Sequence, residues 1–306
     1  MTKPYEIYQY LEGEPMTGRD VKEAGSKFWN EGKWENFVVP FLPEDGSGMA
    51  LVDMGCNAGL FLKLAEERGF QAIGVDSNEV AVRRGTEWRD KHGYQYQIIN
   101  STIQECIDEL PVVDYTLWVN AHYYFTVPEW LEYLDKLQHK TLNCIIVTDE
   151  KKFINRCWAS TDVKDIRSCL RNWKETGFID LLPTDGDPSP RKLRSLCFQS
   201  WSLEKVPVAS LDSSNHVQDR FYEQLDSGKT YLETGYYRIL KKYRAKWGEG
   251  FLNRWVERKV ELYEDIKRNG LKTAIIVDSA DKILDGNHRY SMMRHLGHEN
   301  IFVRRI

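Results

Sequence analysis

The sequence of 306 residues lacks long apolar runs, whereas a membrane-spanning helix needs about 20 apolar residues. Its N-terminus, MTKPYEIYQYLEGEP, also lacks the apolar core of a signal peptide. Neither a membrane partner nor export is therefore expected. With 42% apolar and 29% charged residues, the composition is typical of a soluble globular protein, and the length is enough for about two domains.

Cysteine is scarce, with six residues scattered along the chain and no C-x-x-C pair. Without such pairs the sequence suggests neither a zinc site nor a disulfide framework, so we predict no bound metal. Reduced thiols are typical of cytosol-like compartments, and we expect a cytoplasmic protein with free cysteines.

Acidic and basic residues are unevenly distributed. Residues 228–306 hold 17 Lys and Arg against 10 Asp and Glu, whereas the first 227 residues hold 25 against 36. An acidic first part joined to a basic second part indicates two modules with different partners. The alternative is that the basic residues only solvate helices.

The stretch LVDMGCNAGLFLKLAEERGFQAIGVD, residues 51–76, predicts a strand, a tight turn, a helix and a second strand. The first apolar run ends on Asp53 and the second on Asp76, while helical spacing starts at Leu60 and stops at Gly69. In a parallel sheet such a unit is right-handed, and ligands lie beyond the carboxyl ends of its strands.

The turn over residues 55–59 carries two glycines that let a ligand approach the backbone, and the following helix offers unpaired N–H groups. Asp76 can accept both hydroxyls of a ribose. Asp53, upstream of the turn, repels phosphate but suits an ammonium group, and the turn lacks the G-x-G-x-x-G of a pyrophosphate site. The pattern favours a ligand with a ribose, no phosphate and a cationic amino-acid end, such as S-adenosylmethionine (SAM).

VDMGCNAG followed by GVD resembles the first two motifs of class I SAM-dependent methyltransferases, with Asn57 in place of the usual middle glycine. Asn also adopts left-handed backbone conformations, so it suits this turn. A Rossmann-type unit for another nucleotide is the alternative. The resemblance implies a Rossmann-like α/β domain whose cofactor-binding residues are Asp53, Gly55, Cys56, Asn57, Gly59, Asp76, Ser77, Ser101, Thr102 and Asn120.

Later patterns complete this domain, which we assign to residues 1–204. The predicted helices cover 79–91, 103–110 and a segment opened by Pro128, and the predicted strands cover 96–99, 112–119, 144–147, 177–182 and 195–202. By resemblance, the last two strands form a closing antiparallel hairpin around the loop TDGDPSPRK. The aromatic residues Phe28, Trp29, Trp34 and Phe37 either cover the cofactor or pack against the sheet, and packing is the commoner role.

Residues 120–125 follow the fourth predicted strand, where class I methyltransferases usually approach the acceptor. The sequence Asn-Ala-His-Tyr lacks the two prolines of the tetrad carried by enzymes that methylate DNA bases, so adenine-N6 or cytosine-N4 methylation is not expected. His122 is a candidate base for a hydroxyl or amine acceptor, because its reference pKa lies near ~6.5. The alternative is that His122 shapes the pocket. We name Tyr123 as a second catalytic candidate, although tyrosines here are more often pocket walls.

Residues 205–306 predict a second module. Aromatic and aliphatic residues keep helical spacing over 236–247 and 252–266, with basic residues between them. Such interleaving indicates nucleic-acid binding in some proteins and more often an amphipathic helix pair with a solvated face.

The run DGNHRYSMM within this module resembles the signature of the ParB/sulfiredoxin-like nucleotide-binding fold. The resemblance implies a smaller α+β domain with a nucleotide or phosphate site at Asp285, Gly286, Asn287, His288 and Arg289. The alternative is structural, with His288 and Arg289 capping the helix and pairing with Asp285.

These patterns predict a SAM-dependent methyltransferase that acts on an O or N atom of a small molecule, including phosphorylated or nucleotide-linked ones. An RNA- or protein-directed methyltransferase docked through the basic module is the alternative, and nucleic acid is not the favoured partner. A nucleic-acid- or nucleotide-binding protein that only senses SAM is the third hypothesis. The acceptor stays open, because a fold does not name its substrate.

Overall fold

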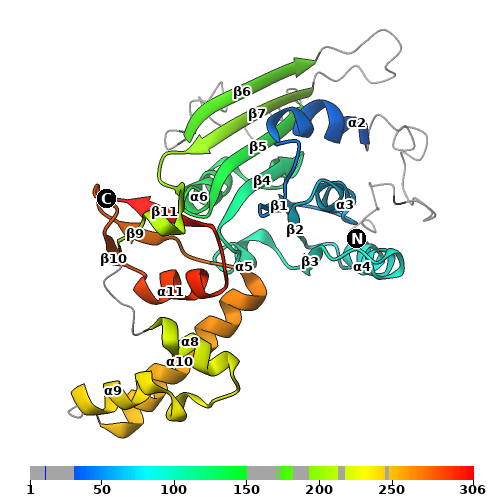
Figure 1. The fold of residues 1–306 in the computed structure, drawn as a ribbon. Helices are drawn as coiled ribbons and strands as arrows, with labels where there is room; N and C mark the ends of the chain where they lie inside the picture. Colours follow the sequence, from blue (N-terminus) through cyan, green and yellow to red (C-terminus); the bar gives the residue numbers. More distant parts are fainter. Residues whose placement is uncertain are drawn as a thin grey trace. The chain divides into compact units, whose positions relative to one another are not determined.

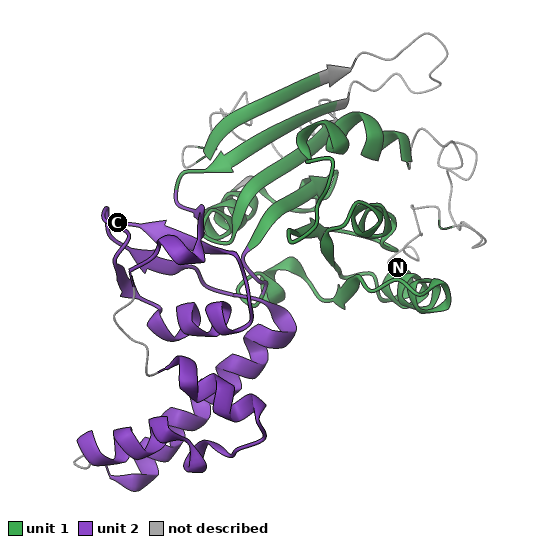
Figure 2. Ribbon diagram, viewed as in Figure 1, with its two compact units in different colours: residues 1–109, 113–201 green, residues 110–112, 202–306 purple. Residues whose placement is uncertain are grey.

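The computed structural model describes residues 11, 31–149, 170, 173–181, 193–212, 218–244 and 248–306. The chain forms two units, residues 1–109 with 113–201 and residues 110–112 with 202–306 (Figure 2). Phe28, Trp29 and the loop TDGDPSPRK, discussed above, lie outside the described residues.

The first unit is built on a seven-stranded sheet with the order β3-β2-β1-β4-β5-β7-β6 (Figure 1). Its strands are β1 (Ala50–Met54), β2 (Gln71–Asp76), β3 (Gln97–Asn100), β4 (Val113–Val119), β5 (Thr141–Asp149), β6 (Trp173–Leu181) and β7 (Leu193–Ser200). Strands β1 to β5 pair in parallel, whereas β7 is antiparallel to both β5 and β6. The predicted α/β sheet with an antiparallel hairpin is therefore confirmed.

Four helices connect the parallel strands: α3 (Leu60–Glu67), α4 (Glu79–His92), α5 (Ile103–Cys106) and α6 (Val127–Leu137). Side-chain caps fix where three of these helices begin. The Asn78 side chain accepts a hydrogen bond from a backbone N–H in the first turn of α4, and Thr102 and Thr126 form capping boxes at the starts of α5 and α6. Helix α5 is shorter than the predicted 103–110, because it ends at Cys106 and residues 107–109 form a turn.

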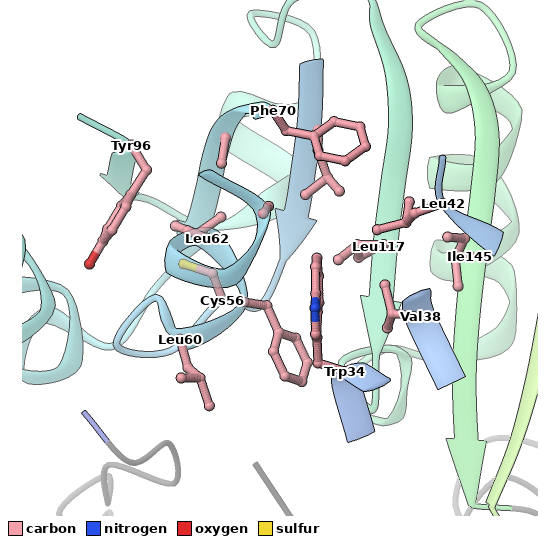
Figure 3. Packing of buried hydrophobic residues seen from close by; sticks show 14 of the residues in the cluster. Trp34, Val38, Leu42, Cys56, Leu60, Leu62, Phe70, Tyr96, Leu117 and Ile145 are labelled. Atoms are coloured by element: carbon pink, nitrogen blue, oxygen red, sulfur yellow. The ribbon is translucent and has the colours of Figure 1, made fainter. Parts of the chain in front are cut away.

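Trp34, Phe37 and Val38 lie in η1 (Trp34–Val38), between α2 (Glu31–Lys33) and η2 (Val39–Phe41). All three side chains are buried in the core of the sheet. Figure 3 shows Trp34 and Val38 in this core. The Trp34 and Phe61 rings lie 5.8 Å apart, and Ser195 Oγ donates to the Phe37 carbonyl over 2.6 Å. These aromatic residues therefore pack against the sheet, the commoner of the two roles considered.

The second unit contains a four-stranded sheet of order β10-β9-β11-β8, in which β11 runs parallel to β9 and antiparallel to β8. Its strands are β8 (Glu204–Pro207), β9 (Ile275–Val277), β10 (Ile283–Asp285) and β11 (Asn300–Arg305). Its helices are η6 (Val208–Ser210), α8 (Asp219–Asp226), η7 (Tyr231–Glu233), α9 (Gly235–Tyr243), α10 (Glu249–Asn269) and α11 (Asn287–His295). Helix α10 begins directly after Gly248, so Gly250 lies in its first turn.

Within the described parts of the chain, no helix combines the length and the apolar character needed to cross a membrane.

Candidate functional site

Strand β1 lies inside the sheet, between β2 and β4, and the strand order reverses there. In open α/β sheets this switch point, at the carboxyl ends of the strands, is where ligands bind. Asp53 lies near the end of β1 and Asp76 ends β2, while Asn120 directly follows β4. The structure thus brings the predicted residues of three strands to one edge of the sheet.

Asp76 ties together the turn after β1 and the start of α4. Its Oδ2 accepts from the Asn57 backbone N–H over 2.7 Å, and its Oδ1 accepts from the Asn78 N–H over 2.8 Å. Burial raises the pKa of the carboxyl, while these two N–H groups act in the opposite direction. Because a carboxylate offers about four lone-pair sites, Asp76 retains capacity for ribose hydroxyls.

Asp53 is the least satisfied polar residue of this edge. Its side chain is 1% exposed, and its Oδ2 has no hydrogen-bond partner among the described residues. Burial, and then the negative charge of Asp76, raise the pKa of Asp53 to about 8. A buried carboxyl group without a partner is costly, and a cationic ligand group would relieve that cost.

The turn between these carboxyl groups depends on left-handed backbone. Asn57 has a φ of 49°, as expected for Asn in place of glycine, and Gly59 caps α3 with a φ of 88° and no side-chain cap. Cys56 is fully buried in the core cluster, and its thiol donates to the Asn57 carbonyl of the turn over 3.8 Å.

Ser101 and Thr102 follow β3 and take part in a capping box at the start of α5. Glu105 Oε2 accepts from the Ser101 and Thr102 hydroxyls over 3.3 and 2.8 Å, and Thr102 Oγ1 accepts from the Glu105 N–H. The Ser101 N–H donates to the Asp76 carbonyl over 3.2 Å, which holds this segment beside β2. The S-T-x-x-E pattern of residues 101–105 predicts this capping box, and the sequence analysis did not name Glu105 as part of it. Ser77 is exposed directly after Asp76.

His122 lies in η3 (His122–Tyr124) and is 1% exposed. Its Nε2 forms a 3.1 Å hydrogen bond with Thr148 Oγ1, and its ring lies 5.4 Å from that of Trp130. Burial lowers the pKa of His122 to about 3. An enclosed, weakly basic imidazole favours the structural alternative over a general base. Tyr124 is 73% exposed, whereas the Tyr123 side chain lies outside the description.

In the second unit, the Arg289 guanidinium is bonded to other groups of the same unit. Its Nη1 donates to the carbonyls of Thr273 and Ala274 over 2.9 and 3.0 Å, and its Nη2 donates to Asp285 Oδ2 over 2.8 Å. Gly286 precedes α11 with a φ of 96° and lets the guanidinium fold back over it. These contacts favour the structural role, in which Arg289 pairs with Asp285, over binding of a phosphate by Arg289.

His288 is likewise engaged within the unit. Its Nδ1 lies 3.1 Å from the Tyr222 hydroxyl and its Nε2 lies 3.3 Å from the Tyr236 hydroxyl. Burial, and then the charge of Lys259, lower the pKa of His288 to about 3. Asn287 is half-buried at the start of α11. A neutral ring with both nitrogens bonded has no donor left for a phosphate.

Lys259 on α10 is a residue that the motif did not point to. It is half-buried, and its Nζ lies 5.1 Å from the centre of the Trp255 ring. Lys259 forms no ion pair with any residue that the structure describes, and burial together with Arg289 lowers its pKa. In the sequence it is one basic residue among many in an amphipathic helix, so no pattern distinguished it.

Residues 28–146 match the family model described as a methyltransferase domain. This part of the chain is a SAM-dependent methyltransferase domain. Magnesium protoporphyrin IX methyltransferase from Synechocystis PCC 6803, crystallised with SAM, is a similar solved structure, with 16% identity over 50% of this chain and 71% of that one and a TM-score of 0.41. A SAM-dependent methyltransferase from Archaeoglobus fulgidus has 15% identity over 59% and 97% of the two chains and a TM-score of 0.44. No curated protein matches the chain.

Proposed function

We propose that this protein transfers the methyl group of SAM to an oxygen or nitrogen atom of a small molecule. The observation that carries the proposal is Asp53, a buried carboxyl group without a partner at Oδ2, beside the turn before α3. The ammonium group of SAM would pair with the ionised form of this carboxyl group, whereas a phosphate would bring a second negative charge beside it.

The residues of the edge divide the binding of SAM between them. Asp53 pairs with the ammonium group, the backbone of residues 55–59 and the α3 N-terminus hold the amino-acid end, and Asp76 accepts the ribose hydroxyls. Ser101 and Thr102 border the adenine, where their segment is fixed beside β2. Ser77 and Asn120 complete the wall of the site.

When bound, SAM supplies an electrophilic methyl group on a sulfonium sulfur. The protein's part is then to align the acceptor's lone pair with that methyl group and exclude water, which accounts for much of the rate enhancement in such reactions. We propose that His122 holds the wall of the acceptor site through Thr148, since its ring is buried and weakly basic. An acceptor that is already nucleophilic fits this arrangement best.

Isothermal titration calorimetry with S-adenosylhomocysteine tests the proposal. We expect one molecule to bind per chain to the wild type, and Asp53→Asn to bind at least about tenfold more weakly through loss of a charged partner. An absence of binding to the wild type would overturn the proposal.

A second candidate is a methyltransferase directed at RNA or at a protein, docked through the second unit. It is favoured by exposed basic side chains on α9 and α10: Arg238, Lys242, Arg254 and Arg258 form no ion pairs with the described residues. RNA binding through such contacts weakens steeply with salt. A filter-binding assay at 50 and 200 mM salt distinguishes the candidates, since a small-molecule enzyme would show no salt-sensitive RNA binding.

We further propose that residues 205–306 form a ParB-like module that binds an anion such as a nucleotide phosphate. Lys259, half-buried without a carboxylate partner, supports an anion beside α11 better than the bonded Arg289 does. Thermal shift with ATP, CTP and phosphate tests this: we expect stabilisation in the wild type that Lys259→Gln loses. A wild type that none of these ligands stabilises would leave the module as a docking or dimerisation module.

We also propose a cytoplasmic location. The observation behind it is that Cys56, Cys106, Cys144 and Cys197, the cysteines among the described residues, are all buried free thiols. Fractionation of cells that express the full chain tests this proposal, and recovery of the protein outside the cytoplasm would contradict it.

A further inference from the structure

The turn after β1 and the loop after β4 touch at two small residues. A Cβ atom built on Gly55 would lie 2.8 Å from the Cβ atom of Ala121. That distance is shorter than real carbon atoms tolerate, so Gly55 leaves room for the Ala121 methyl group. Ala121 is 5% exposed and packs across the switch point of the sheet.

Both partners are fixed by backbone bonds on their far sides. Gly55 and Cys56 donate to the Val75 carbonyl over 2.8 and 3.1 Å, which holds the turn against β2. On the other loop, Asn120 donates to the Val147 carbonyl over 3.0 Å from a left-handed conformation with a φ of 57°. Neither loop can therefore retreat without breaking a hydrogen bond to its neighbouring strand.

We infer that Ala121 is a positioning residue that sets the place of the cofactor turn relative to the acceptor loop. This inference rests on the proposed function, in which the backbone of residues 55–59 holds the amino-acid end of SAM. The methyl group of Ala121 fills the space beside Gly55. Ala121 directly precedes η3, which carries His122 and the exposed Tyr124. The donor and acceptor halves of the site thus share one contact.

The size of residue 121 then controls cofactor affinity. A branched side chain would push against the Gly55 backbone, which has no side chain to move aside, and would shift the turn away from the N–H groups of α3. A glycine at position 121 would leave a small space into which the turn could shift. This should perturb the site less than a branched side chain does. Affinity is therefore expected to peak at alanine.

The experiment measures S-adenosylhomocysteine affinity by calorimetry and melting temperature for Ala121→Gly, Ala121→Ser and Ala121→Val. We expect affinity to fall about tenfold or more for Val and about threefold for Gly and Ser, in line with the cost of overpacking and of small cavities. The matched control is Ala72→Val, a 4% exposed alanine on β2 paired with Leu51. It should lower the melting temperature without weakening binding.

A role limited to packing would lower stability in both valine variants and leave both affinities unchanged, and that result overturns the inference. If Ala121→Val does not fold, the Gly and Ser variants decide: affinity equal to the wild type in both also overturns it. A wild type that does not bind S-adenosylhomocysteine overturns the proposed function itself, which is a separate result.

Discussion

The turns that precede α3 and α11 have the same local form but differ in how their polar groups are satisfied. In both, a glycine with left-handed backbone begins the helix without a side-chain cap, Gly59 with a φ of 88° and Gly286 with a φ of 96°. Beside the first turn, Asp53 keeps a buried oxygen without a partner, whereas Arg289 of the second turn donates to two carbonyls and a carboxylate.

The difference shows that turn geometry alone does not distinguish a ligand site from a structural turn. Buried polar groups in folded proteins are nearly always bonded, because leaving one unbonded costs about 1–3 kcal/mol. At the carboxyl ends of the strands, where ligands bind, a buried carboxyl oxygen that stays unbonded is a candidate for pairing with a ligand. A side chain whose polar atoms are all bonded within the protein already has its partners. By this criterion Asp53 is a candidate ligand-binding residue, whereas Arg289 and His288, whose polar groups are bonded, are not.

The largest effect is expected for Asp76→Ala. The substitution removes the acceptor of the Asn57 and Asn78 N–H groups as well as the proposed ribose contact. We expect S-adenosylhomocysteine affinity to fall about ten- to a hundredfold, because this is the contribution of one charge-assisted hydrogen bond to binding. Calorimetry provides the measurement, and an unchanged affinity would remove Asp76 from the site.

Arg289→Ala should instead lower stability and leave cofactor affinity unchanged. It deprives the Thr273 and Ala274 carbonyls of their donor, so we expect a loss of about 1–3 kcal/mol in the free energy of unfolding. S-adenosylhomocysteine affinity should not change. Urea unfolding and calorimetry on one preparation check both expectations. If the variant were as stable as the wild type but were no longer stabilised by a nucleotide that stabilises the wild type, Arg289 would be a ligand-binding residue after all.

The sequence predicted the first unit well, because its signals are local. The apolar runs of β1 and β2, the turn over residues 55–59 and the acid at the end of each strand all follow from neighbouring residues. The partners of His122 and His288 could not be predicted, since Thr148, Tyr222 and Tyr236 lie 26 to 66 residues away in the chain. The contact of Gly55 with Ala121 joins two loops in the same way.

A smaller effect is expected from acid, through His122. Because its pKa falls from 6.5 in the unfolded chain to about 3 in the folded one, the unfolded chain binds more protons between these values. Stability should therefore fall as the pH drops through 6.5 towards 3. We expect the wild type to lose about 1–2 kcal/mol more than His122→Asn between pH 7 and 5. Urea unfolding at both pH values measures this, and equal losses would contradict the burial of a neutral ring.

Asp53 should show the reverse dependence. Its pKa rises from 3.8 to about 8 on folding, so the folded protein holds more protons than the unfolded chain between these values. Without ligand, the contribution of Asp53 to stability therefore falls as the pH rises through this window. A bound ammonium group favours the ionised carboxylate, so binding of S-adenosylhomocysteine below pH 8 should release the Asp53 proton.

The most direct test is calorimetry of S-adenosylhomocysteine binding at pH 6, 7 and 8 in buffers of different ionisation enthalpy, for the wild type and Asp53→Asn. For the wild type we expect release of about one proton at pH 6 and 7 and affinity that rises up to about tenfold per pH unit. Asp53→Asn should bind more weakly, without proton release. Equal affinity and equal proton release in the two proteins would contradict the assignment of the unpartnered Asp53 carboxyl as the cofactor's counter-ion.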